Sequence, residues 1–177
     1  MTGNGLDRAP RWLFPAAVAG ALLLVGGAYA NHFHNAFHFD DSHVIEDNLA
    51  IRSLANAPRF FSDAATFSTL ADHQTYRPLL PLTFAVDYSL GGGLDPLAFH
   101  ISQFLFHLMV GLGIFLLVRK ASDAALAGSA NRYFALLAAT WFCLHTANTE
   151  TVNYLSSRSD ILSTLGMGLL ISTVSST

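Results

Sequence analysis

The sequence predicts an all-α integral membrane protein with three to four membrane helices and a long outer loop that carries short interfacial helices. Hydrophobic residues make up 52% of the chain and charged residues only 12%, and the mean hydropathy is +0.41. This composition is too apolar for an ordinary soluble domain. The apolar residues are grouped in runs that approach the length of a membrane helix. The nine Lys and Arg residues are scattered, so no nucleic-acid partner is expected.

The first apolar run, residues 12–30, contains no charged residue. About 20 residues are enough to cross a hydrocarbon core of about 30 Å as a helix, so we expect a first membrane helix here. The alternative is a cleaved secretory signal peptide, because Ala28-Tyr29-Ala30 has the small-x-small form of a cleavage site. The run is long for the apolar region of a signal peptide, which favours the membrane helix. Either reading places Asn31 and the following residues on the far side of the membrane.

Residues 31–96 form a polar segment that holds most of the acidic side chains. A segment of this length is unusual as a simple connection, and long loops commonly carry function. Within it, residues 77–88 are apolar but short and contain Pro78 and Pro81. We therefore expect them to lie at the membrane interface rather than to span it. The glycines of 91–96 predict a turn before the next helix.

Three further segments complete the predicted organisation. Residues 99–118 form the second membrane helix, and 119–132 form a short inner loop that begins with two basic residues. Residues 133–154 start as a third apolar run and end in polar residues. Residues 161–174 are too short for a full membrane crossing and are predicted to be an incomplete fourth helix. The chain is accordingly expected to be the amino-terminal part of a larger protein.

The basic residues next to the apolar runs predict the orientation, because such residues are favoured on the cytoplasmic side. A cytoplasmic N-terminus places most of them inside, and the candidate site residues then fall together on the outer face. We expect a multi-pass protein of the bacterial inner membrane, with the endoplasmic reticulum as the alternative. The predicted inner residues are Arg8, Arg11, Arg119, Lys120 and Arg132, and the predicted outer site residues are Asp40, Asp41, Arg77, Glu150, Arg158 and Asp160.

This outer group fits sugar transfer from a lipid-linked phosphate donor. Such a reaction needs a carboxylate that deprotonates the acceptor hydroxyl, and we assign this role to Asp40 or Asp41, with Asp41 preferred. Glu150 is a further candidate catalytic carboxylate. The leaving phosphate needs cations, and an arginine binds its oxygens in pairs and stays charged, so Arg77 and Arg158 are the candidates.

Less specific readings remain open for each of these residues. The acidic pair could bind a divalent cation or belong to a solvated loop. The arginines could instead reach lipid headgroups. Glu150 and Asp160 could be solvated helix ends or form a salt bridge with Arg158.

Several histidines lie near the acidic pair: His32, His34, His38 and His43. Imidazole and carboxylate groups together can bind zinc or another transition metal. These spacings match no compact metal-binding signature, so no metal site is predicted, and Asp40, Asp41 and His43 are only weak candidates. If a cation is bound, Mg²⁺ or Mn²⁺ beside a phosphate is the expected cofactor.

Four motifs in order resemble one known family. They are His38-Phe-Asp-Asp-Ser-His-Val-Ile-Glu-Asp-Asn48, Tyr76-Arg-Pro-Leu79, Leu90-Gly-Gly-Gly-Leu-Asp-Pro96 with Phe99-His100 and His107, and Leu144-His-Thr-Ala-Asn-Thr-Glu150 with Ser157-Arg-Ser-Asp160. Together they are similar to the membrane part of the transmembrane and tetratricopeptide-repeat O-mannosyltransferases and their bacterial relatives. The family commonly has His-Pro at 145–146 and Gly-Arg-Ala-Asp at 157–160, and this chain contains none of its repeats.

The resemblance implies the N-terminal part of a GT-C glycosyltransferase fold. It also implies a polyprenyl-phosphate sugar as donor and the acidic pair as the catalytic motif. We expect a protein or glycan hydroxyl as acceptor, and His43, Tyr76 and Asp160 as supporting residues. Two other functions stay open. A transporter would place charged residues inside the helices, and these runs are almost free of them. A non-catalytic membrane module would only bind lipid or a protein partner.

Overall fold

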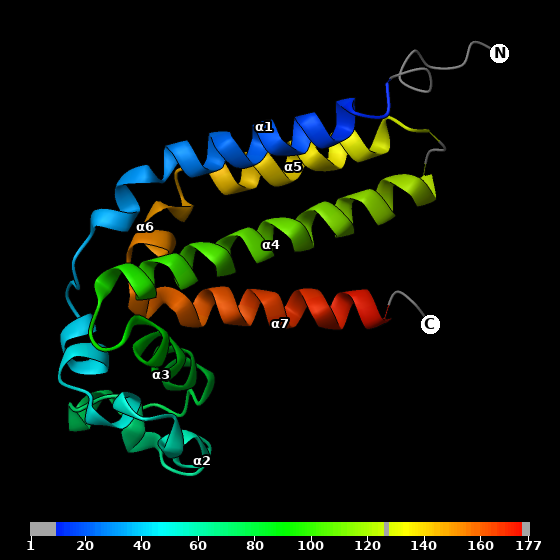
Figure 1. The fold of residues 1–177 in the computed structure, drawn as a ribbon. Helices are drawn as coiled ribbons and strands as arrows, with labels where there is room; N and C mark the ends of the chain where they lie inside the picture. Colours follow the sequence, from blue (N-terminus) through cyan, green and yellow to red (C-terminus); the bar gives the residue numbers. More distant parts are fainter. Residues whose placement is uncertain (1–9, 126–127, 175–177) are drawn as a thin grey trace. The chain divides into compact units, whose positions relative to one another are not determined.

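The computed structural model describes residues 10–125 and 128–174, and within these ranges the chain is helical with no β-strand (Figure 1). The prediction of an all-α fold is confirmed for these residues. The chain divides into two compact units, one formed by residues up to Ala30, His107–Asn148 and residues from Thr164, and one formed by Asn31–Phe106 and Thr149–Ser163. Each unit has its own packing and is described separately.

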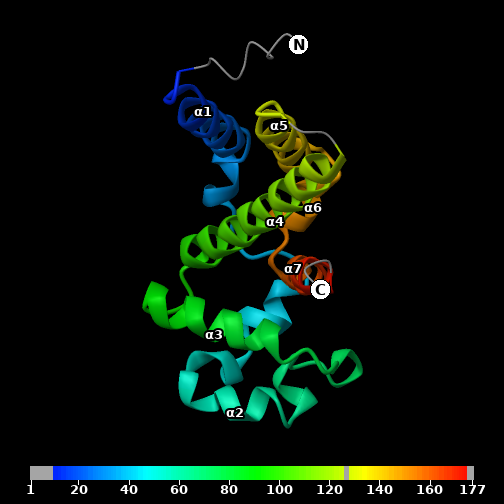
Figure 2. The same ribbon diagram turned by 90° about the vertical axis from the view of Figure 1, so that its right-hand side faces the viewer.

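The first unit contains three apolar helices: α1 (Leu13–Ala28), α5 (Asn131–Leu144) and the C-terminal part of α4 (Pro96–Ala125). In Figures 1 and 2, α1 lies beside α5 and runs in the same direction, while α4 runs the opposite way. The aromatic ring of Phe14 at the start of α1 fits this arrangement, because it contacts a ring at the start of α5 and one near the end of α4. The partner rings are Tyr133, with 5.4 Å between centroids, and Phe115, with 6.3 Å.

One described helix, α4, is long and apolar enough to cross a membrane, while α1 and α3 (Leu79–Gly91) are shorter apolar helices. Charged side chains occur on α4 only in its last part, at Arg119, Lys120 and Asp123. Many apolar side chains on α4 are exposed: Ile101, Leu105, Met109, Leu112, Leu116 and Leu117.

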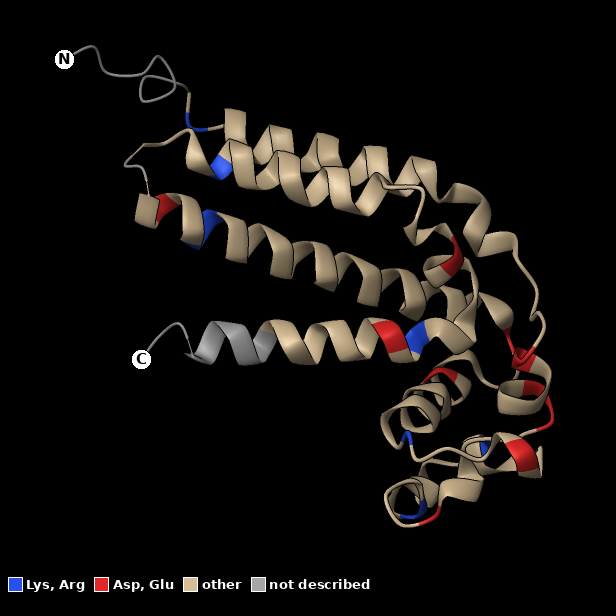
Figure 3. Cartoon of the chain, turned by 180° about the vertical axis from the view of Figure 1, so that it is seen from behind, with Lys and Arg blue, Asp and Glu red and all other residues tan. Residues whose placement is uncertain are grey.

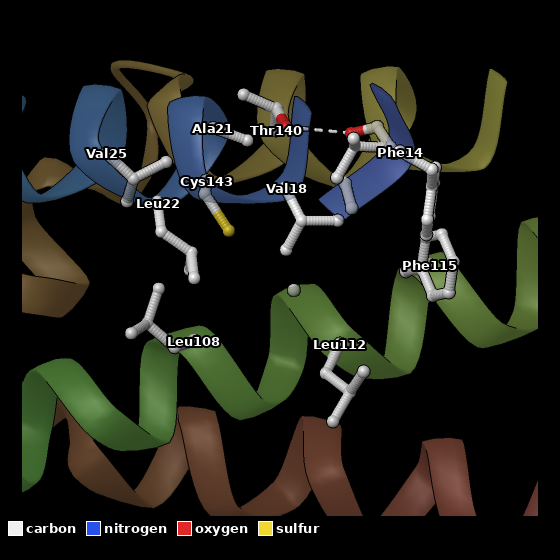
Figure 4. A pocket seen from close by; sticks show the side chains of 13 residues that line it. Phe14, Val18, Ala21, Leu22, Val25, Leu108, Leu112, Phe115, Thr140 and Cys143 are labelled. Carbon is white, nitrogen blue, oxygen red and sulfur yellow. Dashed lines mark hydrogen bonds between the residues drawn. The ribbon is translucent and has the colours of Figure 1, made fainter. Parts of the chain in front are cut away.

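A small apolar cavity of about 210 Å³ lies among α1, α4 and α5 (Figure 4). Its polar atoms already have partners, since the Thr140 hydroxyl donates a hydrogen bond to the Leu136 carbonyl at 2.7 Å. On one side, α4 approaches α5 closely at Gly111. A Cβ atom at this position would lie 2.5 Å from the Cys143 sulfur, so only glycine fits without a shift.

The second unit is built on α3 and a series of short helices. Its core contains Phe84 and Leu80 of α3, with Ile45, Ile51 and Phe60 from the preceding segment. The short elements are η2 (Ala30–His34), a π-helix η3 (Ser42–Glu46), η4 (Leu49–Arg52), η5 (Leu54–Asn56), α2 (Ala57–Phe60), η6 (Ala64–Thr66), η7 (Ala71–His73), α6 (Asn148–Asn153), η8 (Leu155–Ser157) and the start of α7 (Arg158–Val174).

Local side chains explain where these short helices begin. Asn48, Ser53 and Asp63 each precede a 3₁₀ helix, and each accepts a hydrogen bond from the backbone N–H two residues later. This contact satisfies one of the N–H groups that a helix start leaves without a partner. At its other end, α3 stops at Gly92, whose φ of +69° is the left-handed conformation that glycine adopts at helix ends. The segment 31–96 is therefore ordered by its own caps and core.

The contact at Gly111 gives a first prediction. Gly111→Ala is expected to lower the free energy of unfolding by about 1–2 kcal/mol, because overpacking costs about 1–3 kcal/mol and outweighs a helix gain of about 0.5–1 kcal/mol. Adding Cys143→Ala should restore stability, since it removes the clashing sulfur. Gly113→Ala is the control, because a Cβ there meets nothing within 4 Å and should be tolerated. Denaturant unfolding in detergent micelles compares these three variants with wild type. Equal effects of Gly111→Ala and Gly113→Ala would contradict the prediction.

Candidate functional site

A polar cavity of about 500 Å³ lies in the second unit, where three segments that are far apart in sequence meet. The segments are 40–44, 67–77 and 154–160. Four of the predicted site residues line this polar cavity: Asp40, His43, Arg77 and Asp160. The other residues of its wall are Val44, Phe67, Asp72, His73, Thr75, Tyr154, Ser156, Ser157 and Ser159. The structure thus brings together residues 40 and 77, which the sequence assigned to complementary roles.

A strained turn at Phe39 carries the chain into the acidic pair. Phe39 has φ of +52°, a left-handed conformation that is uncommon for a residue with a Cβ atom. Its ring is 87% exposed and packs edge-on against Tyr154, with 6.1 Å between ring centroids. The Asp40 backbone N–H donates a hydrogen bond to the Tyr154 hydroxyl at 3.3 Å. Both contacts join the turn to the 154–160 segment.

The two adjacent aspartates have different surroundings. Asp41 is 1% exposed, and its carboxylate accepts hydrogen bonds from the His38 N–H at 3.1 Å and from the Ser156 N–H and hydroxyl at 3.1 and 2.8 Å. Burial raises the pKa of Asp41, and these hydrogen bonds oppose the rise. The Asp40 side chain is 55% exposed and lines the polar cavity. Asp40 is therefore the accessible carboxylate, and Asp41 holds two segments of the wall together.

Arg77 lies between the polar cavity and a second, more apolar cavity of about 400 Å³. Its guanidinium donates a hydrogen bond to the Ser159 hydroxyl at 3.1 Å and lies over the Phe67 ring at 5.4 Å. Ser159 and Asp160 line both cavities as well. The remaining residues of the second cavity are Tyr76, Pro78, Leu79, Leu80, Leu162 and Ser163. Tyr76, a predicted supporting residue, thus lines the second cavity and not the first.

Arg158 lies elsewhere than predicted, since it lines neither cavity and is fully buried. Its guanidinium pairs with the Asp87 carboxylate at 2.5 Å and donates hydrogen bonds to the Gln103 side chain at 2.9 Å, the Phe99 carbonyl at 3.0 Å and the Ser102 hydroxyl at 2.8 Å. Burial raises the pKa of Asp87, while the charge of Arg158 opposes the rise. All three guanidinium nitrogens have protein partners, so a phosphate could reach Arg158 only by displacing them.

Asp87 and Gln103 were not among the predicted site residues, although both are hydrogen-bonded to Arg158 in this buried cluster. Their signal was present, because each is an isolated polar residue within an apolar run. A buried polar group needs a hydrogen-bond partner, so such residues predict a partner of matching charge or polarity elsewhere. The sequence does not say which arginine of the predicted outer side that partner is: Arg52, Arg59, Arg77 or Arg158.

Two other predictions concern Glu150 and the histidines. Glu150 is exposed in the first turn of α6 and lines neither of the two cavities. His32 has a structural place, since its ring nitrogens contact the His100 carbonyl at 2.9 Å and the Asn153 side chain at 3.2 Å. Burial lowers the pKa of His32, which favours the neutral ring. Among residues 10–125 and 128–174, no group of three or more His, Cys, Asp or Glu side chains is placed to bind a metal ion.

Charges are distributed unequally between the two units, as Figure 3 shows. Every described acidic residue except Asp123 belongs to the second unit. The first unit holds Arg11, Arg119, Lys120 and Arg132 among its described residues. The polar cavity consequently lies in the acidic unit, where Arg77 is the cation on its wall.

No protein-family model matches the chain, and no solved structure matches it. Characterised proteins do match. The chain is 32% identical to human protein O-mannosyl-transferase TMTC4 over 84% of this chain and 21% of that protein. It is 31% identical to human protein O-mannosyl-transferase TMTC1 over 92% of this chain and 19% of that protein. For Drosophila melanogaster protein O-mannosyl-transferase Tmtc1 the identity is 30%, over 84% of this chain and 17% of that protein.

The chain spans about a fifth of the length of these relatives. The predicted resemblance is confirmed, because the homologues are O-mannosyltransferases of the type that the four ordered motifs indicated.

The Arg158 cluster gives a second prediction. Arg158→Met is expected to lower the free energy of unfolding by about 3–5 kcal/mol, because it leaves the Asp87 carboxylate buried without a counter-charge. Adding Asp87→Leu should recover most of this loss, since the pair is then replaced by apolar groups. Arg59→Met is the control. Arg59 forms an exposed pair with Asp63 at 3.4 Å, and its loss should cost less than about 1 kcal/mol.

Denaturant unfolding in micelles measures these variants. An Arg158→Met protein as stable as wild type would show that the cluster does not stabilise the fold.

Proposed function

We propose that this chain, whose homologues over most of its length are TMTC-type protein O-mannosyltransferases, binds donor and acceptor in a membrane glycosyltransferase with a GT-C fold. The donor is a polyprenyl-phosphate sugar, mannose or a similar hexose, and the acceptor is a protein or glycan hydroxyl. One observation carries the proposal: Asp40 and Arg77, an accessible carboxylate and an exposed cation, line the same polar cavity.

The proposed chemistry assigns one role to each. Asp40 accepts the proton of the acceptor hydroxyl as its oxygen bonds to the anomeric carbon of the sugar. The bond between that carbon and the phosphate oxygen breaks, and the phosphate leaves with the electron pair. Arg77 stabilises the negative charge that develops on the phosphate, since a guanidinium can bind two of its oxygens and stays charged. The hydrogen bonds to Asp41 favour Asp40 as the base, because those bonds occupy the buried carboxylate.

The position of Arg77 between two cavities supports an amphiphilic donor. We propose that the phosphate binds at Arg77, the sugar lies in the polar cavity, and the first isoprene units lie in the second cavity against Leu79, Leu80 and Leu162. Asp160, which lines both cavities, is suited to accept hydrogen bonds from sugar hydroxyls. Arg158 is assigned a structural role and not a phosphate-binding one, because its donors are already used.

The proposed topology places α1, α4, α5 and α7 in a bacterial inner membrane, or alternatively in the endoplasmic reticulum, with the N-terminus in the cytoplasm. The distribution of basic residues supports it, since Arg119, Lys120 and Arg132 flank one connection between apolar helices. The acidic segment 31–96 then faces the outer side.

Cysteine labelling tests this topology as a third prediction. In a Cys143→Ala background, Ser62→Cys should react with a membrane-impermeant maleimide added outside intact cells, and Ser122→Cys should react only after permeabilisation. Ser62 lies in the outer segment and is exposed, whereas Ser122 lies near the cytoplasmic end of α4. The background change removes the only native thiol. Labelling of Ser122→Cys in intact cells would contradict the orientation.

The fourth prediction concerns catalysis in a longer protein that contains this chain. Asp40→Asn should lower kcat by about 10² to 10⁴, because general-base help is typically worth that factor. Arg77→Lys should also lower kcat, since a point charge replaces a two-pronged donor. Asp41→Asn should lower activity together with stability, because it disturbs buried hydrogen bonds.

The assay is transfer of labelled sugar from a polyprenyl-phosphate donor in proteoliposomes. Asp47→Asn is the matched control, because this exposed carboxylate in the same segment lines neither of the two cavities. If Asp40→Asn and Asp41→Asn both kept wild-type turnover, the acidic pair would have no catalytic role, and a non-catalytic membrane module would explain the chain better.

A further inference from the structure

His43 has one ring nitrogen with a fixed partner and one without. It lies in the π-helix η3, is 8% exposed, and lines the polar cavity. Its Nδ1 atom is 2.9 Å from the Ser68 hydroxyl oxygen. Its Nε2 atom is buried and has no hydrogen-bond partner, while the nearest carboxylate oxygen, Oδ1 of Asp40, is 3.5 Å away. A buried polar nitrogen without a partner is uncommon and calls for an explanation.

The contacts of Ser68 favour one tautomer of the His43 ring. The Ser68 oxygen already accepts a hydrogen bond from the Leu70 N–H at 3.0 Å. Its own proton can go to His43 Nδ1 at 2.9 Å or to the Leu70 carbonyl at 3.4 Å, and the shorter contact is favoured. A neutral imidazole that accepts at Nδ1 carries its proton on Nε2. The N–H group of His43 is therefore the one nearest to Asp40.

Backbone hydrogen bonds fix the segment that carries Ser68 beside the segment that carries His43. The Thr69 N–H and hydroxyl both donate to the carbonyl of His43, at 3.1 and 3.3 Å. Asn48 adds a second connection, because its side-chain amide donates to the Val44 carbonyl at 3.2 Å and the Thr66 carbonyl at 3.0 Å. Ser68 is thus fixed beside the imidazole by contacts that do not involve the ring, and it is itself 1% exposed.

We propose that Ser68 and His43 are positioning residues for Asp40, arranged as a chain in which the Ser68 hydroxyl donates to His43 Nδ1 and His43 Nε2–H donates to an Asp40 oxygen. This inference rests on the proposed role of Asp40 as the base. The Asp40 side chain is 55% exposed, so a small rotation can shorten the 3.5 Å separation to an ordinary charge-assisted hydrogen bond of about 2.8 Å. One carboxylate oxygen is then held by His43, and the other faces the acceptor hydroxyl. No proton leaves His43 or Ser68 in this arrangement.

The tautomer of the His43 ring tests this series of hydrogen bonds without an activity assay. ¹⁵N spectra of the histidine rings of this chain in micelles should show His43 as the Nε2–H tautomer, with the signal assigned by its loss in His43→Gln. Ser68→Ala should shift His43 toward a mixture of tautomers, because the donor to Nδ1 is gone. Thr69→Ala is the matched control, since its hydroxyl contacts the backbone of His43 and not the ring. A wild-type Nδ1–H tautomer, or no change in Ser68→Ala, would overturn the proposed chain.

A catalytic arm in the longer protein tests the positioning role. Ser68→Ala and His43→Ala should each lower kcat about 10- to 100-fold with the donor KM unchanged, because a misplacement of about 1 Å can cost about 10²-fold. His43→Gln should recover part of the loss over His43→Ala, since its amide can place an N–H near the former Nε2. Thermal unfolding of each variant identifies any that fail to fold. If a variant fails to fold, the tautomer of His43 in the wild-type chain decides.

The two proposals fail in distinguishable ways. If Asp40→Asn abolishes transfer while Ser68→Ala keeps wild-type kcat, the positioning role is wrong and the proposed function stands. If Asp40→Asn transfers sugar at the wild-type rate, Asp40 is not the base and the positioning role is wrong with it; if Asp41→Asn does so as well, the proposed function is wrong. The tautomer result would then report only on the hydrogen-bond chain.

Discussion

The second unit depends on a buried ion pair between Arg158 and Asp87. Two charges removed from water are costly, and the cost is offset only when every donor and acceptor is satisfied. Here the guanidinium reaches the carboxylate of α3 and, on α4, the Gln103 side chain and the Phe99 carbonyl. Arg158 is also the first residue of α7. Because the Arg158 guanidinium is hydrogen-bonded to both α3 and α4, the position of the first residue of α7 is fixed.

That fixed start determines one wall of the polar cavity. Ser156, Ser157 and Ser159 flank Arg158 and line the cavity. The opposite wall is attached to the same segment through Asp41, which accepts two hydrogen bonds from Ser156. The Arg158–Asp87 ion pair and the buried Asp41 carboxylate together hold this serine segment in place. Asp40 and Arg77 are exposed and line the cavity, so their charged groups can reach a ligand.

The sequence predicted the helical character of the chain because that follows from local patterns. It also placed six polar residues on one side of the membrane, and of these Asp40, Arg77 and Asp160 line the polar cavity. Apolar runs without charge predict helices, and polar residues on one predicted side of a membrane can share a site. The number of membrane crossings stays a prediction. The pairing of Arg158 with Asp87 could not be predicted, because four arginines fall on that side and only packing decides which of them is buried. The second cavity, at Tyr76, was likewise unpredictable, because it is formed by two segments far apart in sequence, 76–80 and 159–163.

Asp40 is exposed and Asp41 is buried because of the backbone turn at Phe39. A residue in a sparsely populated conformation costs about 1–3 kcal/mol, and Phe39 is such a residue. Hydrogen bonds to a charged group contribute about 1.5–3 kcal/mol each, and the Asp41 carboxylate accepts three. These bonds offset part of the cost of burying the carboxylate, although burial still raises the pKa of Asp41. The turn that puts Asp41 inside leaves Asp40 facing the cavity, so the left-handed conformation of Phe39 is the local condition for an accessible carboxylate there.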